Sequence, residues 1–379
     1  MTAHPARRRP LDVAVVAPSM AILGGQAVQA DRLLAAWAGD ADVHAWLVPV
    51  NPVPTRPLRA LTRIKLARTL AVQSAYWPLL VRELRRADVV HVFSASYFSF
   101  LLAPLPAVLI ARLLRKPVVM NYRSGEAPDH LTRSAIARAV LRGVDRNVVP
   151  SSFLRDVFAR FRIHADVIPN IVDLDRFAYR PRAILRPRLL STRNFEALYN
   201  VACTLEAFAL IQARVPEATL TLVGAGSQER ALRRRAASLG LRGVTFAGRV
   251  APGEIWRYYA DADIYVQTPN IDNMPSSVLE AFASGCAVVS TDAGGVPAIL
   301  TDGVHGCLVP CGDARAVAGR VLHLLGRPEE AARLAAAARA SCERYRWSAV
   351  RTAWLTVYRQ MAGIERTSMG REPAAPVSA

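Results

Sequence analysis

Two acidic residues and a pair of serines lie within nine positions of each other in the second half of the chain. Asp272 stands in a loop after an apolar run, and Ser276-Ser277 opens a segment of helical spacing that carries Glu280. Free amides at a helix start bind phosphate groups, and carboxylates accept hydrogen bonds from ribose or sugar hydroxyls. An acid pair at this spacing alone is more often structural than functional. The full string Thr268–Pro297, in which a second apolar run and two glycines follow the helix, is more specific.

Short apolar runs that alternate with helical patterns must position these residues. The runs are apolar throughout, which is typical of parallel strands buried on both faces. Helical spacing is found, for example, at Val201–Ala213, Gln228–Ala237 and Ser276–Ala283. Strands are expected at Val13–Val16, Val43–Val48, Val89–Phe93, Val118–Asn121, Arg146–Val149, Asp166–Ile168, Leu189–Ser191, Thr219–Val223, Val244–Ala247, Ile264–Gln267, Ala287–Ser290 and Gly306–Val309.

This order predicts an α/β protein with two doubly wound, Rossmann-like domains. Pro181 and Pro187 interrupt the pattern within Tyr179–Arg188, so the boundary is placed there. We expect an N-terminal domain at 1–180, a C-terminal domain at 181–345, a helix within 346–365 that crosses back to the first domain, and a disordered tail at 366–379. Ligands bind beyond the carboxyl ends of the strands in such sheets, so a cleft between the two domains is the expected site.

The composition limits the classes of function. With 52% hydrophobic residues in 379, the chain has ample core and is not largely disordered. Of the formal charge of +18, residues 1–180 carry +12, from 25 Lys and Arg against 13 Asp and Glu. A basic first half suits donor phosphates, anionic lipid headgroups or nucleic acid, and a solvated basic surface explains it equally well. Nucleic acid is disfavoured because the sequence holds no known binding motif and no interleaved aromatic residues.

Membrane and redox signals are weak. Asp12 and Pro18 break the apolar run after Arg7–Arg9, which favours a buried strand over a signal peptide. Tyr97–Ala111 is too short and too proline-broken to span a bilayer. It is expected as a buried helix, with a surface helix as the alternative. The five cysteines have no metal-ligand spacing, so reduced thiols and no metal site are expected.

The Thr268–Pro297 string resembles the donor-site signature of retaining GT-B glycosyltransferases of the family 4 type, also called glycosyl transferases group 1. The likeness runs over nearly the whole chain, and the order and spacing of its parts are more specific than any one of them. These parts are Gly24-Gly25-Gln26, Val167–Asp173, Leu222–Gly226, Phe246–Val250, Tyr258–Asp263 and Asp302–Pro310.

The resemblance implies a role for each matching residue. Glu280 would hold the ribose hydroxyls, and Asp272, where the family usually has a glutamate, would face the transferred sugar. The backbone of Asn273, Met274 and Pro275 would line the sugar, and the amides of Ser276 and Ser277 would bind the phosphates. Arg249 and Val250 would lie against the base, and Gly25 would approach the diphosphate from the first domain. Gly24 and Gly224 would also bind the donor.

Two positions depart from the family pattern. The family commonly has an arginine and, five residues later, a lysine that hold the diphosphate; here these positions are Asn194 and Tyr199. A guanidinium suits a diphosphate because it offers paired donors and a fixed charge. We therefore expect Arg193, one position earlier, or an arginine of the first domain to substitute.

The second departure is Arg123, in the loop where relatives often place a histidine. An arginine stays protonated and is no base, but it can neutralise a phosphate. Glu126 and His130 are nearby and face either the acceptor or solvent. His91, within an expected strand, is expected to be structural.

The resemblance thus implies a retaining glycosyltransferase without a metal or other cofactor, with catalytic contributions from Asp272, Glu280, Arg193 and Arg123. Its partners would be a nucleotide-diphosphate sugar, a sugar, glycan or lipid-linked acceptor, and an anionic membrane surface. The expected location is cytoplasmic, peripheral at the inner membrane face. A catalytically silent sugar-nucleotide-binding partner of a membrane glycan assembly complex is the alternative, because the usual clamp residues are missing. A sugar-nucleotide epimerase on the same fold is a more distant one.

Overall fold

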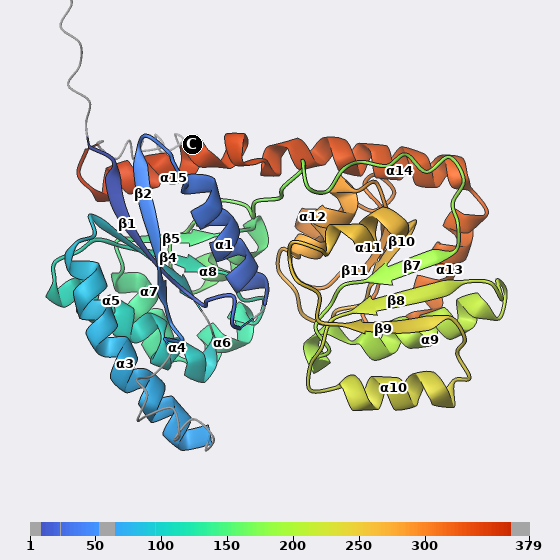
Figure 1. Ribbon diagram of the computed structural model, residues 1–379, viewed down its shortest axis with the longest axis horizontal. Helices are drawn as coiled ribbons and strands as arrows, with labels where there is room; N and C mark the ends of the chain where they lie inside the picture. The colour runs from blue at the N-terminus through green and yellow to red at the C-terminus, as the bar shows by residue number, and fades with distance from the viewer. Residues whose placement is uncertain (1–8, 23, 53–64, 95, 365–379) are drawn as a thin grey trace, which may run out of the picture.

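The computed structural model describes residues 9–22, 24–52, 65–94 and 96–364, which form two α/β units side by side (Figure 1). The predicted disordered tail at 366–379 lies outside the described residues. Each unit has one six-stranded sheet, and every strand pairing is parallel. The two doubly wound sheets expected from the sequence are thereby confirmed.

The first sheet has the strand order β2-β1-β3-β4-β5-β6. Its strands are β1 Leu11–Ala17, β2 Val43–Pro49, β3 Val89–Ser94, β4 Val118–Tyr122, β5 Arg146–Val149 and β6 Asp166–Val167. Its helices are α1 Gly25–Trp37, α3 Lys65–Arg85, α4 Tyr97–Leu102, α5 Pro104–Leu113, α6 Ala127–Arg133, α7 Ala135–Gly143 and α8 Ser152–Arg160. All residues of β3 are buried, as a strand covered on both faces requires.

The second sheet has the order β12-β11-β10-β7-β8-β9. Its strands are β7 Arg188–Ser191, β8 Thr219–Val223, β9 Val244–Gly248, β10 Ile264–Gln267, β11 Ala287–Thr291 and β12 Cys307–Val309. Its helices are α9 Val201–Gln212, α10 Glu229–Ser238, α11 Trp256–Asp261, α12 Ser276–Ala283, α13 Ala314–Leu325 and α14 Pro328–Ser341, with short 3-10 turns at Ala197–Tyr199, Val296–Ala298 and Cys342–Tyr345. Each of the twelve expected strands is found within two residues of its predicted bounds.

One expectation about a helix needs correction. The stretch Tyr97–Ala111 forms two helices, α4 and α5, because the chain turns at Ala103 and restarts at Pro104. Proline is favoured in the first helical turn, where its missing N–H is not needed. The stretch is also not wholly buried, since Phe98 is 66% exposed and Leu109 is 46% exposed.

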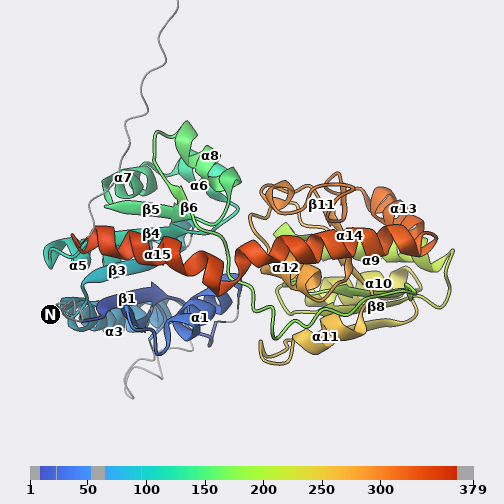
Figure 2. The same ribbon diagram turned by 90° about the horizontal axis from the view of Figure 1, so that it is seen from above.

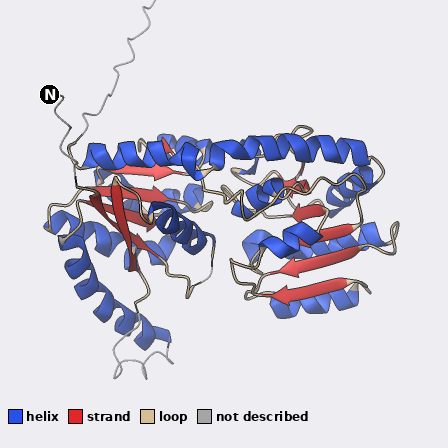
Figure 3. Cartoon of the chain, turned by 45° about the horizontal axis from the view of Figure 1, so that its top comes forward, coloured by secondary structure: helices blue, strands red, loops and turns tan. Residues whose placement is uncertain are grey.

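The last helix, α15 Trp347–Met361, returns to the first unit, so that α14 and α15 form a continuous ridge over both units (Figures 2 and 3). Trp354 and Tyr358 of α15 are buried in one core cluster with Trp37 and Val119 of the first unit. His91 is structural, as expected: it is buried, with its Nδ1 2.7 Å from the Tyr358 hydroxyl and its Nε2 3.0 Å from Asn121 Nδ2.

Arg351 ties α15 to the first unit through Asp40 and Asp42. Its Nε lies 2.7 Å from Asp40 Oδ2, and its Nη2 lies 2.6 Å from Asp42 Oδ2. The hydrogen bond from Arg351 lowers the pKa of Asp40. A carboxyl whose folded-state pKa is lowered contributes stability above its unfolded pKa of about 3.9, and this contribution is lost as the pH falls.

We expect Arg351→Met to lower the free energy of unfolding by about 1 kcal/mol at pH 7, a size typical of partly exposed ion pairs. The deficit should shrink as the pH falls below about 4, where Asp40 becomes protonated in the unfolded chain. Urea unfolding at pH 7 and pH 3 measures both values. The exposed Arg315 provides the control variant Arg315→Met, and an equal loss in both variants would contradict the assignment.

Candidate active site

The carboxyl ends of β1, β4 and β5 face those of β7 and β10 across a cavity of about 340 Å³ between the two units. In both sheets the chain reverses its winding direction near these ends, between β1 and β3 and between β7 and β10. Such switch points form the crevices in which open α/β sheets bind ligands.

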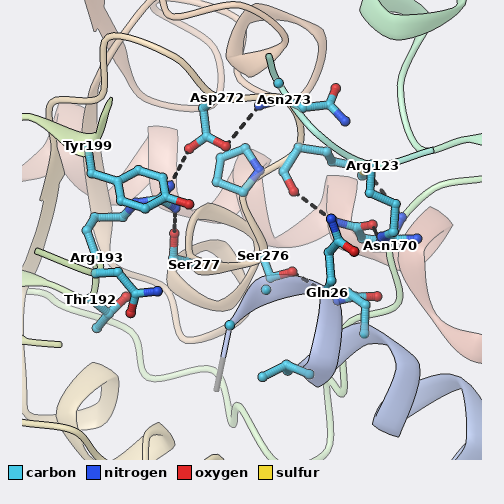
Figure 4. A pocket seen from close by; sticks show the side chains of 18 of the residues that line it. Gln26, Arg123, Asn170, Thr192, Arg193, Tyr199, Asp272, Asn273, Ser276 and Ser277 are labelled. Carbon is cyan, nitrogen blue, oxygen red and sulfur yellow. Dashed lines mark hydrogen bonds and ion pairs between the residues drawn. The ribbon is translucent and has the colours of Figure 1, made fainter. Parts of the chain in front are cut away.

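The structure places all the candidate site residues around this one cavity. They are Gly24, Gly25, Arg123, Arg193, Asn194, Tyr199, Gly224, Arg249, Val250, Asp272, Asn273, Met274, Pro275, Ser276, Ser277 and Glu280. In Figure 4, Arg193, Tyr199 and Asp272 lie on one side, and Arg123 with Asn170 lies on the other.

Arg193 follows β7 and is held by three neighbours. Its Nη2 lies 2.6 Å from Asp272 Oδ2, its Nη1 donates to Ser277 Oγ at 3.1 Å, and its guanidinium carbon lies 4.0 Å from the centre of the Tyr199 ring. Burial disfavours the charge, but Asp272 and three nearby tyrosines together outweigh it, so that the pKa of Arg193 is raised. Its buried Nε–H has no hydrogen-bond partner in the described chain. Arg193 is therefore a fixed cation that has one N–H group without a hydrogen bond to the described residues.

Glu280 lies one turn into α12 and is buried against two donors. Arg32 Nη2 lies 2.5 Å from its Oε1, and the Tyr259 hydroxyl donates to its Oε2 at 2.9 Å. Burial, and next the nearby Glu280, raise the pKa of Tyr259 well above its usual value. Tyr259 therefore stays a protonated donor that fixes the Glu280 carboxyl group.

Gln29 and Arg32 of α1, which contact α12, were not predicted as site residues from the sequence. Gln29 donates through Nε2 to Ser276 Oγ at 2.9 Å and to the Ile171 carbonyl at 3.0 Å. Arg32 contacts the same carbonyl at 3.2 Å. Gly25, Gln29 and Arg32 are spaced i, i+4 and i+7, which puts them on one helix face. This helical spacing from the glycine loop was the sequence signal that could have identified Gln29 and Arg32 as site residues.

Arg123 is held by amide oxygens rather than by a carboxylate. It donates to Asn121 Oδ1 at 3.3 Å and to Asn170 Oδ1, and Asn170 in turn donates to the Met274 carbonyl at 2.7 Å. Burial lowers the pKa of Arg123 to about 9. It therefore remains a cation at pH 7 and is connected to the Met274 loop of the other unit.

Glu126 and His130 lie near Arg123 in the sequence, which did not decide whether they face the site or solvent. Glu126 lines the cavity. His130 does not line the cavity and is not at the surface: it is buried, with Nδ1 2.8 Å from the Tyr122 hydroxyl. The helix α6 turns this side chain inward against the ring of Phe100.

Gly125 of the first unit approaches the Asp272 backbone of the second. A Cβ at Gly125 would lie 2.9 Å from the Asp272 carbonyl carbon, closer than packed carbons allow. Because backbone meets backbone here, any side chain must displace the Asp272 loop.

We expect Gly125→Ala to lower kcat/KM for the reaction in this cleft about tenfold, because small displacements of positioning groups are costly. The thermal midpoint should change little, since Gly125 does not need a positive φ. Gly319→Ala is the matched control, as a Cβ there meets nothing within 4 Å. Equal activities of the two variants would refute the importance of this contact.

Among the described residues, no three His, Cys, Asp or Glu side chains are grouped so that they could hold a metal ion. The five cysteines are free. No described helix combines the length and apolarity that crossing a bilayer requires.

Two Rossmann-like units that face one cleft form the GT-B fold, which is typical of one class of glycosyltransferases. Comparison with protein families agrees: Glycosyltransferase Family 4 matches residues 8–176, and Glycosyl transferases group 1 matches residues 185–341. The chain belongs to the GT-B glycosyltransferases of the family 4 type and is a hexosyltransferase of EC class 2.4.

Individual relatives are similar over most of the chain. The phosphatidyl-myo-inositol mannosyltransferase of Mycobacterium leprae is 28% identical, over 73% of this chain and 74% of the relative. The alpha-monoglucosyldiacylglycerol synthase of Streptococcus pneumoniae is 26% identical, over 58% and 55%. The structure of Anabaena HepE with UDP and glucose superposes with a TM-score of 0.72 at 16% identity, covering 92% of this chain and 99% of HepE.

Proposed function

We propose that this protein is a retaining glycosyltransferase that moves a hexose from a nucleotide-diphosphate sugar onto a lipid-linked or glycolipid acceptor. The observation that carries the proposal is the interdomain cavity, in which Arg193, the start of α12 and Glu280 lie together. The acceptor class is suggested by the relatives, whose names specify phosphatidyl-inositol and diacylglycerol lipids.

The proposed chemistry needs stabilisation of the departing diphosphate more than it needs a base. Arg193 supplies a fixed charge and an unused N–H, and the first amides of α12 supply further donors. Asp272, held by Arg193, would face the transferred sugar. In a retaining reaction the acceptor hydroxyl attacks the face that the diphosphate leaves. The bond from the sugar to the diphosphate oxygen breaks and the new glycosidic bond forms. The hydroxyl proton passes to the departing diphosphate, while the closed cleft excludes water. Because arginine and amide donors take the diphosphate charge, we propose that no metal is needed.

The first experiment is a thermal-shift screen with UDP-, GDP-, ADP- and dTDP-sugars. Transfer from the selected donor to an extracted lipid acceptor is then followed by NMR of the anomeric proton, with and without EDTA. We expect retention of the anomeric configuration and no effect of EDTA. Inversion, or loss of activity with EDTA that Mg²⁺ restores, would reject the corresponding part of the proposal.

The uncharged residues Asn194 and Tyr199 favour the second candidate, a silent sugar-nucleotide-binding partner of a glycan assembly complex. Calorimetry with the selected donor, combined with donor hydrolysis and transfer assays, separates the two functions. Tight binding without any turnover would select the silent partner.

We also propose that the first unit docks on an anionic membrane through α3 and α5, which pack against each other. Leu70 and Trp77 lie on one exposed face of α3, and Leu109 and Leu113 lie one turn apart on α5. Exposed arginines lie beside them on both helices. Apolar side chains flanked by basic ones are typical of surfaces that bind anionic lipid.

We expect the double variant Leu109→Ser/Leu113→Ser to bind phosphatidylglycerol vesicles at least about tenfold more weakly than the parent protein, since each leucine loses its apolar burial. Vesicle flotation measures the bound fraction. Leu210→Ser, which changes a leucine 42% exposed on α9 of the other unit, is the control. An equal loss in both proteins would place the membrane contact elsewhere.

A further inference from the structure

The carboxyl group proposed to hold the donor ribose already has a partner from the other unit. The Arg32–Glu280 ion pair crosses the cleft, and its side chains are only 14% and 9% exposed. A buried charge that loses its partner is strongly destabilising. A ribose that binds Glu280 must therefore compete with Arg32, and Arg32 then needs another anion.

A second contact lies beside this pair, one turn away. Gln29 precedes Arg32 by three residues on α1, and Ser276 precedes Glu280 by four on α12. The Gln29–Ser276 and Arg32–Glu280 contacts therefore lie next to each other between the two helices. Through them, α1 occupies the polar groups of α12 next to which the donor's phosphates and ribose would bind.

Four arginines line the cavity, Arg32, Arg123, Arg193 and Arg249, but the position where the family commonly has a lysine carries no cation. Arg193 is paired with Asp272, and Tyr199, at the position of the usual lysine, carries no positive charge. Arg32 also lines the cavity and reaches it from the first unit. Its guanidinium offers the paired donors that match phosphate oxygens.

We propose that Arg32 exchanges partners when the donor binds: it leaves Glu280 for the diphosphate, and the ribose hydroxyls take its place on Glu280. The inference rests on the proposed function. The exchange leaves neither buried charge without a partner, whereas a donor that displaced Arg32 into an apolar environment would leave one. Arg32 thus supplies the cation absent at Tyr199, and the same side chain holds the cleft together before the donor arrives.

Calorimetry with a nucleoside diphosphate and with its nucleoside tests the exchange. The pair is UDP and uridine, or GDP and guanosine if the screen selects GDP. We expect Arg32→Met to bind the nucleoside diphosphate about tenfold or more weakly, the size of a lost charged hydrogen bond. Binding of the nucleoside should be unchanged or stronger, since Glu280 no longer has a competitor. Arg32→Lys should recover part of the diphosphate affinity. Arg32→Gln keeps a hydrogen-bond donor for Glu280 but no charge, so it should not recover the diphosphate affinity. It replaces Arg32→Met in the test if that variant fails to fold.

The opposing results are distinct. If Arg32→Met bound UDP and uridine more weakly by the same factor, Arg32 would only support the structure. If it bound both equally well or more tightly, Arg32 would join the two units without contacting the phosphates. Either result would overturn the exchange. Gln29→Met, which removes the uncharged neighbouring contact, should affect UDP and uridine by the same factor. If the unaltered protein bound no nucleoside diphosphate, the proposed function would fail, and the exchange with it. Binding by the unaltered protein with no selective loss in Arg32→Met would overturn the exchange alone.

Discussion

Replacing Arg193 with methionine should lower kcat/KM for sugar transfer by about a hundredfold or more. Arg193 is the cation fixed at the end of β7, and its buried Nε–H has no hydrogen-bond partner among the residues that the structure describes. Donors aimed at a developing negative charge contribute most in sites that exclude water, because they need no reorganisation. Since this contact strengthens as the diphosphate leaves, the loss should fall mainly on kcat.

Stability must be separated from catalysis, because Arg193→Met also leaves Asp272 without its partner. Loss of one member of a buried pair costs about 3–5 kcal/mol. The double variant Arg193→Met/Asp272→Asn removes both charges and should recover much of the thermal midpoint without recovering activity. Arg193→Lys should retain the midpoint better than activity, since lysine keeps the charge but loses the fork geometry. Activity that recovers in step with the midpoint would mean that Arg193 only supports the fold.

Replacing Glu280 with glutamine should weaken donor binding about tenfold to a hundredfold, by loss of charged hydrogen bonds to the ribose. The substitution keeps the size of the side chain, and Tyr259 can still donate to its amide oxygen. We expect the loss with the nucleoside as well as with the diphosphate, in contrast to Arg32→Met. Far-ultraviolet circular dichroism checks the fold. A Glu280→Gln protein with full transfer activity would remove Glu280 from the donor site.

Much of this architecture could be predicted because buried parallel strands leave a simple trace in the sequence. A run such as Val89–Phe93 is apolar throughout, so its place and burial follow directly. The candidate site followed from the rule that ligands bind beyond the strands' carboxyl ends. That rule places Arg193, Arg123 and Asp272 in loops that must meet if the two sheets face each other.

The residues that were missed or misplaced depend on contacts between segments distant in sequence. Gln29 and Arg32 occupy ordinary polar positions of an amphipathic helix, and their role appears only in side-chain contacts that cross the cleft to α12. His130 was expected near an acceptor or solvent, but the orientation of α6 directs it toward Tyr122. No local pattern encodes these orientations, because they depend on how helices pack.

The return of α15 to the first unit bears on how the polypeptide reaches its native state. The indole of Trp37 meets that of Trp347 with ring centres 4.6 Å apart, and the same core cluster includes Trp354 and Tyr358. These partners emerge from the ribosome long after the sheet that they cover. The nascent first unit therefore presents an apolar surface to chaperones until α15 has been synthesised. A gene split after residue 180 would yield a first fragment that still lacks this cover.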